Sequence, residues 1–511
     1  MTLSPAATAP RPAATLQPRP VPPESARRLF MAGACLVLLA YALPLLWVAA
    51  RTGHLPNLFY EDEVIYSARV LNAYRGGTLA NPYLAGHENA PRYMPEIAER
   101  TFAVLAHATG ISALTILALS RVAVPVLIFA CMWAAARAMG LGPRLALLAA
   151  LLPELAPSSA AIGPHFLRYL RLVSPGFYVL LLVMTLWLWK RAQNQPGPGT
   201  AVLAGAATGV LFYTPPYYWG FAMAGALALT LASPARRWFG IALAMGLLVG
   251  APALWHTFAI ARLPEVQQTL HRLDLMTPGR TPDVFVLPRF AACLVFGVVL
   301  WTQRRRLRAN GVFLLAFLLT GTFLLIQNVV TNRHLQSYHW IECLIPVGAL
   351  ALGALMQHTR FSRGAFIAIV LLAGASVTSQ IGASLSLEQD SARDPVRWRT
   401  ELQVPATIAW LRAHTPGSVL LARDYTDVLP LFLDNKFYVA SYCDQHVLSD
   451  AETAARNRGY DWDPQHPEPL AYRADYFLGF GSQCASSPLP VLYRNSAEAT
   501  CVLDLRSTEA K

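Results

Sequence analysis

Long apolar segments alternate with short polar loops along most of the chain. The first runs from Leu29 to about Ala50, and it is longer than the apolar core of a signal peptide, which favours an uncleaved helix. The other candidate segments are 111–137, 144–158, 173–189, 199–214, 217–232, 238–255, 287–302, 311–329, 341–357 and 364–380. Because roughly 20 apolar residues cover the hydrocarbon core of a bilayer, the pattern predicts a polytopic α-helical membrane protein with about eleven transmembrane helices. Segment 144–158 is short and also fits a half-span.

The two ends of the chain have a different character. Residues 1–28 are rich in Pro and Ala and read as a disordered tail. Charged residues become frequent after the membrane region 29–380, and the remainder, 381–511, predicts a small α/β domain. Its expected elements are an amphipathic helix and four short strands: Pro405–His414, Ser418–Ala422, Phe437–Ala440, Tyr476–Phe480 and Cys501–Leu505.

Basic residues fall in every second loop. If the N-terminus is cytoplasmic, all the inside loops are basic, with Arg27/Arg28, Arg137/Arg144, Lys190/Arg191, Arg236/Arg237, Arg304 to Arg308 and Arg360/Arg363. This agrees with the positive-inside rule and predicts a multi-pass protein, which in a bacterial cell would lie in the cytoplasmic membrane. The long loop 51–110 and the C-terminal domain then lie outside the cytoplasm.

Composition excludes several other classes of protein. The 511 residues are 55% hydrophobic and only 14% charged, against roughly 25% charged in soluble domains. The net charge of +12 is accounted for by the basic loops, and no basic patch with interleaved aromatic residues indicates nucleic-acid binding. Cysteine spacing suggests no metal site, whereas Cys443, Cys484 and Cys501 could supply one disulfide in an oxidising compartment.

The first outer loop, 51–110, contains the most informative motif. The acidic triplet Glu61-Asp62-Glu63 begins a short helix over 64–75, with Val64, Ala68, Leu71 and Tyr74 on one face, and Gly76-Gly77 ends it. Acids at a helix N-terminus also favour the helix dipole, which is a sufficient explanation for one of them. Three adjacent acids repel one another, so we expect Asp62 to act as a general base, with Glu63 as a second candidate and Glu61 solvated.

A general base that activates an attacking group needs a partner that stabilises the leaving group. A leaving phosphate favours Arg, whose guanidinium makes permanently charged, bidentate contacts. The candidates on the same side are Arg92, Arg168, Arg171 and Arg333, each equally explained as an interfacial anchor. His339-Trp340 adds polar groups at the membrane boundary, where such groups are costly. Glu342, just inside a predicted span, needs a partner, for which Arg333 or His334 would serve.

These motifs together resemble the GT-C superfamily of membrane glycosyltransferases, which includes protein O-mannosyltransferases and the lipid A aminoarabinose transferase. The similarity rests on an outer loop that opens with Asp62-Glu63, followed by a surface helix, Asn81-Pro82-Tyr83 and a Pro-containing stretch. A second match is a Gln-to-His-Trp pattern before the tenth span, made up of Gln327, Thr331, Arg333, Gln336 and His339-Trp340. The resemblance covers most of the chain in architecture, although its motifs are short.

The resemblance implies transfer of a hexosyl or pentosyl group from a polyprenyl-phosphate carrier to an acceptor at the outer membrane face. It implies Asp62 as the catalytic base, with Glu63 as the second candidate, and inversion at the sugar carbon. A further first-loop acid would take part, and either Glu88 or Glu96 could fill that place. The substrate-binding residues would be Glu88, Arg92, Glu96, Arg168, Arg171, Arg333 and His339. No metal or other cofactor is expected, although Glu61 and Glu63 could imitate a metal-binding acidic pair.

The acceptor could be a glycan, a lipid or a protein, and the sequence does not distinguish them.

Two functions other than sugar transfer also remain open at this point. A transporter or flippase for a lipid-linked sugar would also need many spans, but no internal repeat of the kind common in transporters is visible. In a non-catalytic envelope assembly protein, the acidic triplet would only cap a helix.

Overall fold

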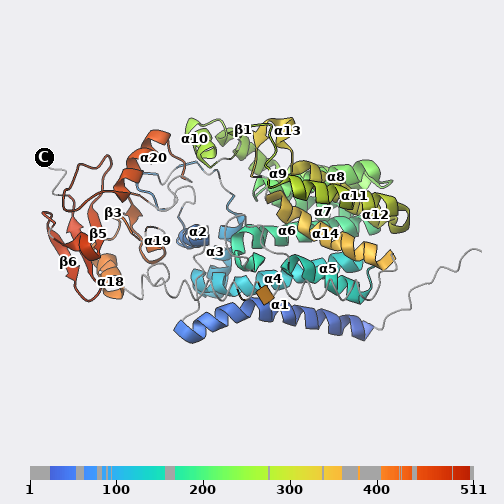
Figure 1. Ribbon diagram of the computed structural model, residues 1–511, viewed down its shortest axis with the longest axis horizontal. Helices are drawn as coiled ribbons and strands as arrows, with labels where there is room; N and C mark the ends of the chain where they lie inside the picture. The colour runs from blue at the N-terminus through green and yellow to red at the C-terminus, as the bar shows by residue number, and fades with distance from the viewer. Residues whose placement is uncertain are drawn as a thin grey trace, which may run out of the picture.

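The computed structural model describes most of the chain (Figure 1). The described residues are 23–52, 63–77, 83–87, 90–91, 93, 95–155, 167–273, 275, 277–336, 339–358, 378–379, 382, 404–424, 426, 428–439, 446–485 and 487–506. The predicted strand at Phe437–Ala440 is therefore covered only in part, and the predicted span 364–380 lies almost wholly outside the described residues.

A bundle of apolar helices occupies most of the molecule. Its members are α1 (Pro23–Thr52), α4 (Ala113–Ala138), α5 (Pro143–Leu155), α6 (Tyr178–Asn194), α7 (Pro198–Leu211), α8 (Pro216–Ala232), α9 (Arg236–Ile260), α11 (Leu287–Leu307), α12 (Ala309–Leu324) and α14 (His339–His358). In the described residues, 5 stretches are long and apolar enough to cross a membrane by length and composition: Glu24–Trp47, Ala113–Ala138, Leu172–Asn194, Arg236–Ile260 and His339–Gln357. The protein is thus a multi-pass membrane protein, while the full count of about eleven crossings stays a prediction.

The outward faces of these helices are apolar. Leu39 on α1 is 62% exposed, Leu248 on α9 is 69% exposed and Val298 on α11 is 62% exposed. Exposed apolar surface of this extent is unfavourable in water, but it is the ordinary state of a helix surrounded by lipid. The same helices therefore need the bilayer to cover the surface that the bundle does not bury.

Small residues bring α7 and α9 into close contact. Gly205 and Gly209 on α7 face α9, where Gly246 and Gly250 recur at the same four-residue spacing. A Cβ atom at Gly205 would lie 2.3 Å from the Ala242 carbonyl oxygen. Pairs of small residues four apart let helix backbones approach closely in membranes, where van der Waals contact is a main source of association energy. This packing joins α9 to α7, which occupies Pro198–Leu211 of the predicted segment 199–214.

Short elements gather at one end of the bundle, which we call the loop face. They are α2 (Glu63–Tyr74), α3 (Ile97–Thr109), η1 (Arg168–Leu170), η2 (Leu172–Phe177), α10 (Pro264–Arg272), β1 (Thr277–Pro278), α13 (Asn328–Thr331) and β2 (Arg333–His334). Helix α2 covers the predicted range almost residue for residue. Its end follows from Gly76, whose φ of +77° is readily adopted only without a side chain.

A five-stranded mixed sheet stands beyond the loop face, at the left of Figure 1. Its strands are β3 (Val419–Ala422), β4 (Lys436–Phe437), β5 (Tyr476–Phe480), β6 (Val491–Asn495) and β7 (Thr500–Asp504), accompanied by α18 (Pro405–His414), α19 (Leu429–Phe432), α20 (Asp450–Asn457), η4 (Arg458–Tyr460) and η5 (Gly481–Cys484). The spatial order is β4-β3-β5-β7-β6, with β3 parallel to both its neighbours. We call residues 404–506 the sheet region; strand β6 was not predicted from the sequence.

Helix α2 lies between the bundle and the sheet region. Val64 and Ala68 belong to the apolar core of the sheet region, whereas Val70 belongs to the core of the bundle and Leu71 and Tyr74 pack against it. The predicted single apolar face is therefore divided between two neighbours. Because both sides of α2 are covered, its position depends on the sheet region as much as on the membrane helices.

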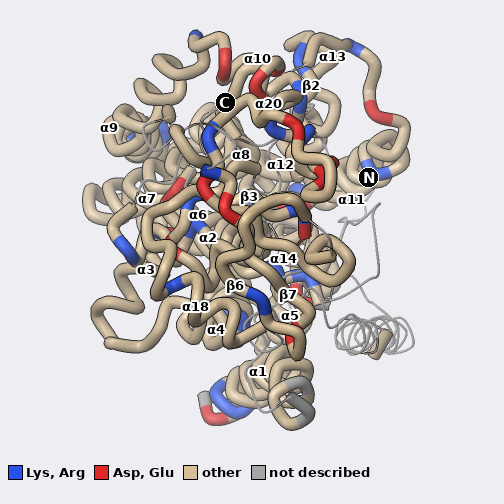
Figure 2. The backbone as a smooth tube through the Cα atoms, turned by 90° about the vertical axis from the view of Figure 1, so that its left-hand side faces the viewer, with Lys and Arg blue, Asp and Glu red and all other residues tan. Residues whose placement is uncertain are grey.

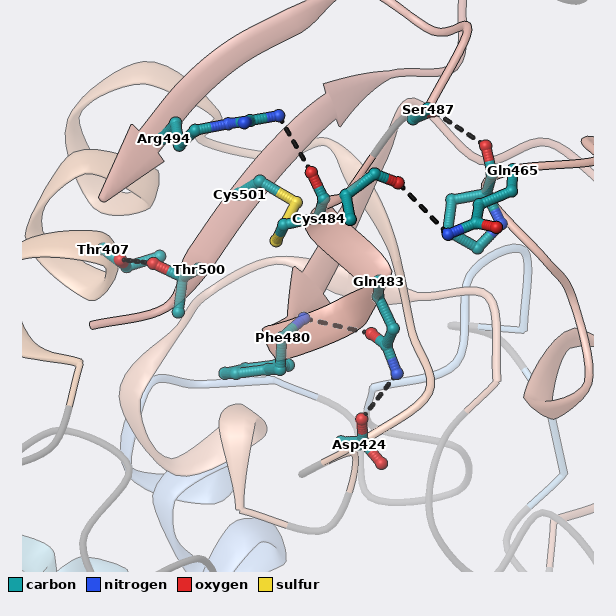
Figure 3. The surroundings of a disulfide bond; sticks show 12 residues. Thr407, Asp424, Gln465, Phe480, Gln483, Cys484, Ser487, Arg494, Thr500 and Cys501 are labelled. Carbon is teal, nitrogen blue, oxygen red and sulfur yellow. Dashed lines mark hydrogen bonds between the residues drawn. A yellow bond between two sulfur atoms is a disulfide. The ribbon is translucent and has the colours of Figure 1, made fainter. Parts of the chain in front are cut away.

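A disulfide joins Cys484 in η5 to Cys501 in β7 (Figure 3). It closes a loop with a sequence separation of 17 residues, and the Arg494 guanidinium donates to the Cys484 carbonyl oxygen beside it at 2.9 Å. Two of the three cysteines proposed for a disulfide are thus paired, and the third, Cys443, lies outside the described residues. A stable disulfide is typical of a compartment outside the cytoplasm.

Removal of this disulfide should destabilise the sheet region. In the double variant Cys484→Ser/Cys501→Ser, we expect a loss of about 3 kcal/mol in unfolding free energy, because closing a loop of this length restricts the unfolded chain. The change is measured by denaturant unfolding of the purified protein. The hydrogen-exchange protection of peptides from residues 404–506 reports the unfolding of the sheet region. A reductant should lower the stability of the wild type and leave the double variant unchanged; equal stability of both proteins would contradict the expectation.

Candidate functional site

The structure describes some of the predicted site residues and not others. Asp62, Glu88 and Arg92 lie outside the described residues. Arg168 is buried, Arg171 and His339 are half-buried, and Arg333 is exposed in β2. All of these described residues lie in or beside elements of the loop face.

Glu63, the residue after Asp62, is fully buried and faces two guanidinium groups. Its Oε2 atom lies 3.5 Å from Nη2 of Arg121, which projects from the first third of α4 and is itself 1% exposed in its side chain. Arg171 interacts electrostatically with the same carboxylate, and the Leu172 backbone hydrogen-bonds to it. We call Glu63, Arg121 and Arg171 the Glu63 cluster.

The Glu63 carboxyl is buried beside positively charged groups. Burial raises the pKa of the Glu63 carboxyl above its ordinary value, and the positive charges of Arg121 and Arg171 oppose that rise. A carboxylate with a raised pKa is a better proton acceptor near neutral pH. Guanidinium groups beside such a site are the kind of side chain that binds phosphate oxygens.

A second buried ion pair fixes the helix that carries Glu63. Nε of Arg69 in α2 lies 2.9 Å from Oε1 of Glu99 in α3, and both side chains are almost fully buried. Arg69 Nη2 also donates to the Pro95 carbonyl oxygen at 3.2 Å. Since a buried charge without its partner is strongly destabilising, this pair holds α2 and α3 in one arrangement.

A third group of polar residues lies at the start of α14, and we call it the His339 cluster. The Tyr218 hydroxyl donates to Oε2 of Glu342 at 2.8 Å, and Nδ1 of His339 lies 4.0 Å from the same oxygen. The ring of Tyr217 packs against His339, with centroids 4.5 Å apart. Arg168 interacts electrostatically with Glu342. The observed partners of Glu342 are therefore Tyr218, His339 and Arg168, whereas the anticipated His334 contacts Asn328 and Thr281.

Two predicted substrate-binding residues have evident structural contacts. Oε2 of Glu96 accepts hydrogen bonds from Arg100 Nε and Nη2 at 2.9 and 2.8 Å, one turn into α3. Arg333 pairs through its backbone with Pro278 of β1, and its carbonyl oxygen accepts from Gln327 Nε2 at 2.8 Å. Neither contact tests a role in substrate binding, so both assignments stay predictions.

Several buried charged residues were not selected from the sequence as site candidates. Arg121 was hidden inside the predicted span 111–137, although an Arg within an apolar segment is itself a functional signal. Arg69 and Glu99 were not considered at all, and no helix was predicted over the residues of α3. Glu154, near the end of α5, is 1% exposed and lies close to Tyr41 and Tyr169. The charge of Arg121 was visible in the sequence, whereas its partner was not.

The described residues contain no group of three or more His, Cys, Asp or Glu side chains arranged to hold a metal ion. Glu61, Asp62 and Glu88 fall outside the part of the chain to which this applies. The side chains that interact with Glu63 in the described residues are the guanidinium groups of Arg121 and Arg171, whose positive charge repels a cation.

Comparison with solved structures identifies the fold. No protein-family model matches the sequence, and no curated protein matches it either. The structure is similar to ArnT from Cupriavidus metallidurans bound to undecaprenyl phosphate, with a TM-score of 0.55 and 13% identity over 94% of this chain and 98% of ArnT. It is also similar to an oligosaccharyltransferase from Archaeoglobus fulgidus, with a TM-score of 0.53 and 13% identity over 88% of this chain and 67% of that one.

A further similar structure is the arabinofuranosyltransferase AftD from Mycobacteria, with a TM-score of 0.54 and 16% identity over 88% of this chain and 35% of AftD. All three are GT-C glycosyltransferases. At such low identity the likeness concerns the fold, and the ArnT match extends over both the helical bundle and the greater part of the remaining chain. The chain therefore has the fold of the GT-C membrane glycosyltransferases, as the first-loop motif and the Gln-to-His-Trp pattern indicated.

Proposed function

We propose that this protein is a glycosyltransferase that moves a sugar from a polyprenyl-phosphate carrier to an acceptor at the outer face of the cytoplasmic membrane. The observation that carries the proposal is the Glu63 cluster. It combines a buried carboxylate adjacent in sequence to Asp62 with two guanidinium groups at the end of a lipid-exposed bundle. The fold shared with ArnT, which was solved with undecaprenyl phosphate, supports a carrier of this class.

In the proposed reaction, Asp62 removes a proton from the acceptor as its oxygen or nitrogen attacks the anomeric carbon of the sugar. The bond between that carbon and the carrier phosphate breaks, and the phosphate leaves with the bonding electrons. Attack from the face opposite the leaving group inverts the configuration. Arg171 and Arg168 bind the leaving phosphate, because guanidinium groups in a buried site stabilise developing negative charge strongly. His339 and the other predicted substrate-binding residues contact the remaining parts of donor and acceptor.

The proposed orientation places the loop face and the sheet region outside the cytoplasm. Two independent features support it. Basic residues recur in every second loop of the sequence, which is the pattern expected of the cytoplasmic side. The Cys484–Cys501 disulfide lies in the sheet region and suits an oxidising compartment. The N-terminus is then cytoplasmic and the C-terminus external.

A binding experiment tests the carrier directly. The purified full-length protein in detergent is titrated with undecaprenyl phosphate, and the complex is measured by native mass spectrometry. We expect Arg171→Ala to weaken binding about tenfold or more, since it removes charge-assisted hydrogen bonds to the phosphate. Arg237→Ala, an exposed Arg at the opposite face, is the matched control and should bind as the wild type does.

The same preparation tests the reaction. Radiolabelled polyprenyl-phosphate sugars are supplied in liposomes together with envelope acceptors, and label leaving the carrier is followed. Transfer by the wild type supports the proposal. Carrier movement across the bilayer without any loss of label from the carrier would support the flippase instead, and absence of both binding and transfer would leave the non-catalytic assembly protein as the better explanation.

A further inference from the structure

A segment of the first outer loop forms part of the C-terminal sheet. The backbone N–H of Phe437 in β4 donates to the Tyr83 carbonyl oxygen at 2.7 Å, and the Ala85 N–H donates to the Phe437 carbonyl oxygen at 3.0 Å. Leu84 forms a parallel bridge with Phe437 and is fully buried in the core of the sheet region. The segment therefore extends the sheet at its β4 edge, across a separation of more than 300 residues in the sequence.

Arg456 of α20 also binds this segment, through hydrogen bonds to backbone carbonyl oxygens. Its Nη2 donates to the Ala85 carbonyl oxygen at 2.9 Å, and its Nη1 donates to the Tyr438 carbonyl oxygen at 2.7 Å. The side chain is 3% exposed and lies over the ring of Tyr472. A planar guanidinium with several donors in fixed directions can hold two backbone segments at once, which Lys cannot do.

Glu452 completes the arrangement. Its Oε1 atom accepts from Arg456 Nε at 2.8 Å and lies 2.7 Å from His87 Nε2. Burial acts to raise the pKa of the Glu452 carboxyl, but the hydrogen bonds from Arg456 and His87 outweigh it and hold that pKa below the ordinary value. The carboxylate is therefore charged at neutral pH and fixes both Arg456 and the His87 end of the segment. Figure 2 shows red and blue positions close together at α20.

The segment leads directly to the helix that begins with Glu63. The Tyr83 hydroxyl donates to the Ala68 carbonyl oxygen in α2. Val64 and Ala68, one residue and five residues after Glu63, pack in the same core as Leu84 and Phe437. The contacts thus run without a gap from Glu452 through Arg456 and residues 83–85 to α2.

We propose that Glu452 is a positioning residue, which acts through Arg456 and the 83–87 segment to hold Glu63 in place. The sheet region is then a structural part of the reaction site at the loop face, and its contribution does not require that it bind the acceptor itself. The inference rests on the proposed function only for its kinetic consequence, because the position of α2 is measurable without any reaction.

Two substitutions at Glu452 test the proposal in the full-length protein. Gln keeps an oxygen that accepts from Arg456 and His87, whereas Leu has a similar volume and accepts nothing. In Glu452→Leu, we expect backbone hydrogen exchange over residues 63–87 to accelerate about tenfold, and kcat for sugar transfer to fall about tenfold with the donor KM within twofold of the wild type. Glu452→Gln should retain most of the wild-type hydrogen-exchange protection and most of the wild-type kcat. His87→Leu removes one of these contacts from the loop side and should show a weaker form of the same change.

The exposed ion pair between Arg75 and Asp434 provides a matched control. It also joins the first outer loop to the sheet region, at 2.6 Å, but the Asp434 side chain is 76% exposed. Asp434→Asn should therefore leave exchange and kcat unchanged. Wild-type exchange and kcat in Glu452→Leu would overturn the proposal, as would an equal effect of Asp434→Asn. If the wild type transfers no sugar, the proposed function fails, while the exchange comparison still decides whether Glu452 positions α2.

Discussion

Replacing Asp62 by Asn is expected to lower the rate of sugar transfer by about three orders of magnitude, while binding of undecaprenyl phosphate stays within about twofold. A positioned general base typically contributes a factor of about 10² to 10⁴, and an amide of the same shape cannot accept the acceptor proton. Because Asn keeps the size and the polarity of the side chain, the start of α2 should be preserved. Rates of transfer from labelled carrier in liposomes, with binding measured separately, give both quantities.

The adjacent acid supplies a close control for this experiment. Glu61→Gln removes one negative charge from the same triplet, at a residue expected to be solvated, and transfer should remain within a few-fold of the wild type. If the two variants lose activity equally, the effect belongs to the total charge of the triplet rather than to one base. Undiminished transfer in Asp62→Asn would remove Asp62 from the mechanism, and Glu63, with its raised pKa, would be the next candidate.

Features encoded by neighbouring residues were predictable from the sequence. Helix α2 was expected over 64–75 and occupies Glu63–Tyr74, because the apolar spacing and the following Gly76 act within one or two turns. Helix α18 has the predicted bounds Pro405–His414. The strand at Tyr476–Phe480 was also predicted, since a run of apolar and aromatic residues favours a buried strand.

Features that depend on distant parts of the chain were not predictable in this way. Nothing near Tyr83 signals that it will pair with Phe437, because the pairing uses only backbone groups. Strand β6 was missed because its pattern is largely exposed and carries Arg494, unlike the apolar strand beside it. Arg121 was visible in the sequence, but its partner Glu63 is 58 residues away, and only the packing of α2 against α4 brings the two together.

Replacing Arg121 by Leu should cost about 3–5 kcal/mol of stability, because it leaves the Glu63 carboxylate buried with less compensating charge. Both side chains are almost fully buried, at 1% and 3% exposure, so water cannot take over the role of the guanidinium. Transfer should fall as well, since the Glu63 cluster loses one of the two groups that offset the carboxylate. Thermal unfolding of the purified protein and transfer from labelled carrier measure the two effects.

A double variant separates stability from function. In Arg121→Leu/Glu63→Leu, both charges of the buried ion pair are removed, while the half-buried Arg171 keeps its charge. Replacement of a buried ion pair by apolar side chains is often neutral or stabilising. We therefore expect thermal stability to recover towards the wild type while transfer stays low. The exposed pair of Glu24 and Arg28 on α1, with side chains 84% and 83% exposed, gives the contrast: Arg28→Ala should change neither quantity measurably. If the double variant regains transfer together with stability, the Glu63–Arg121 pair serves only to fasten α2 to α4, and the carboxylate and guanidinium have no part in the reaction.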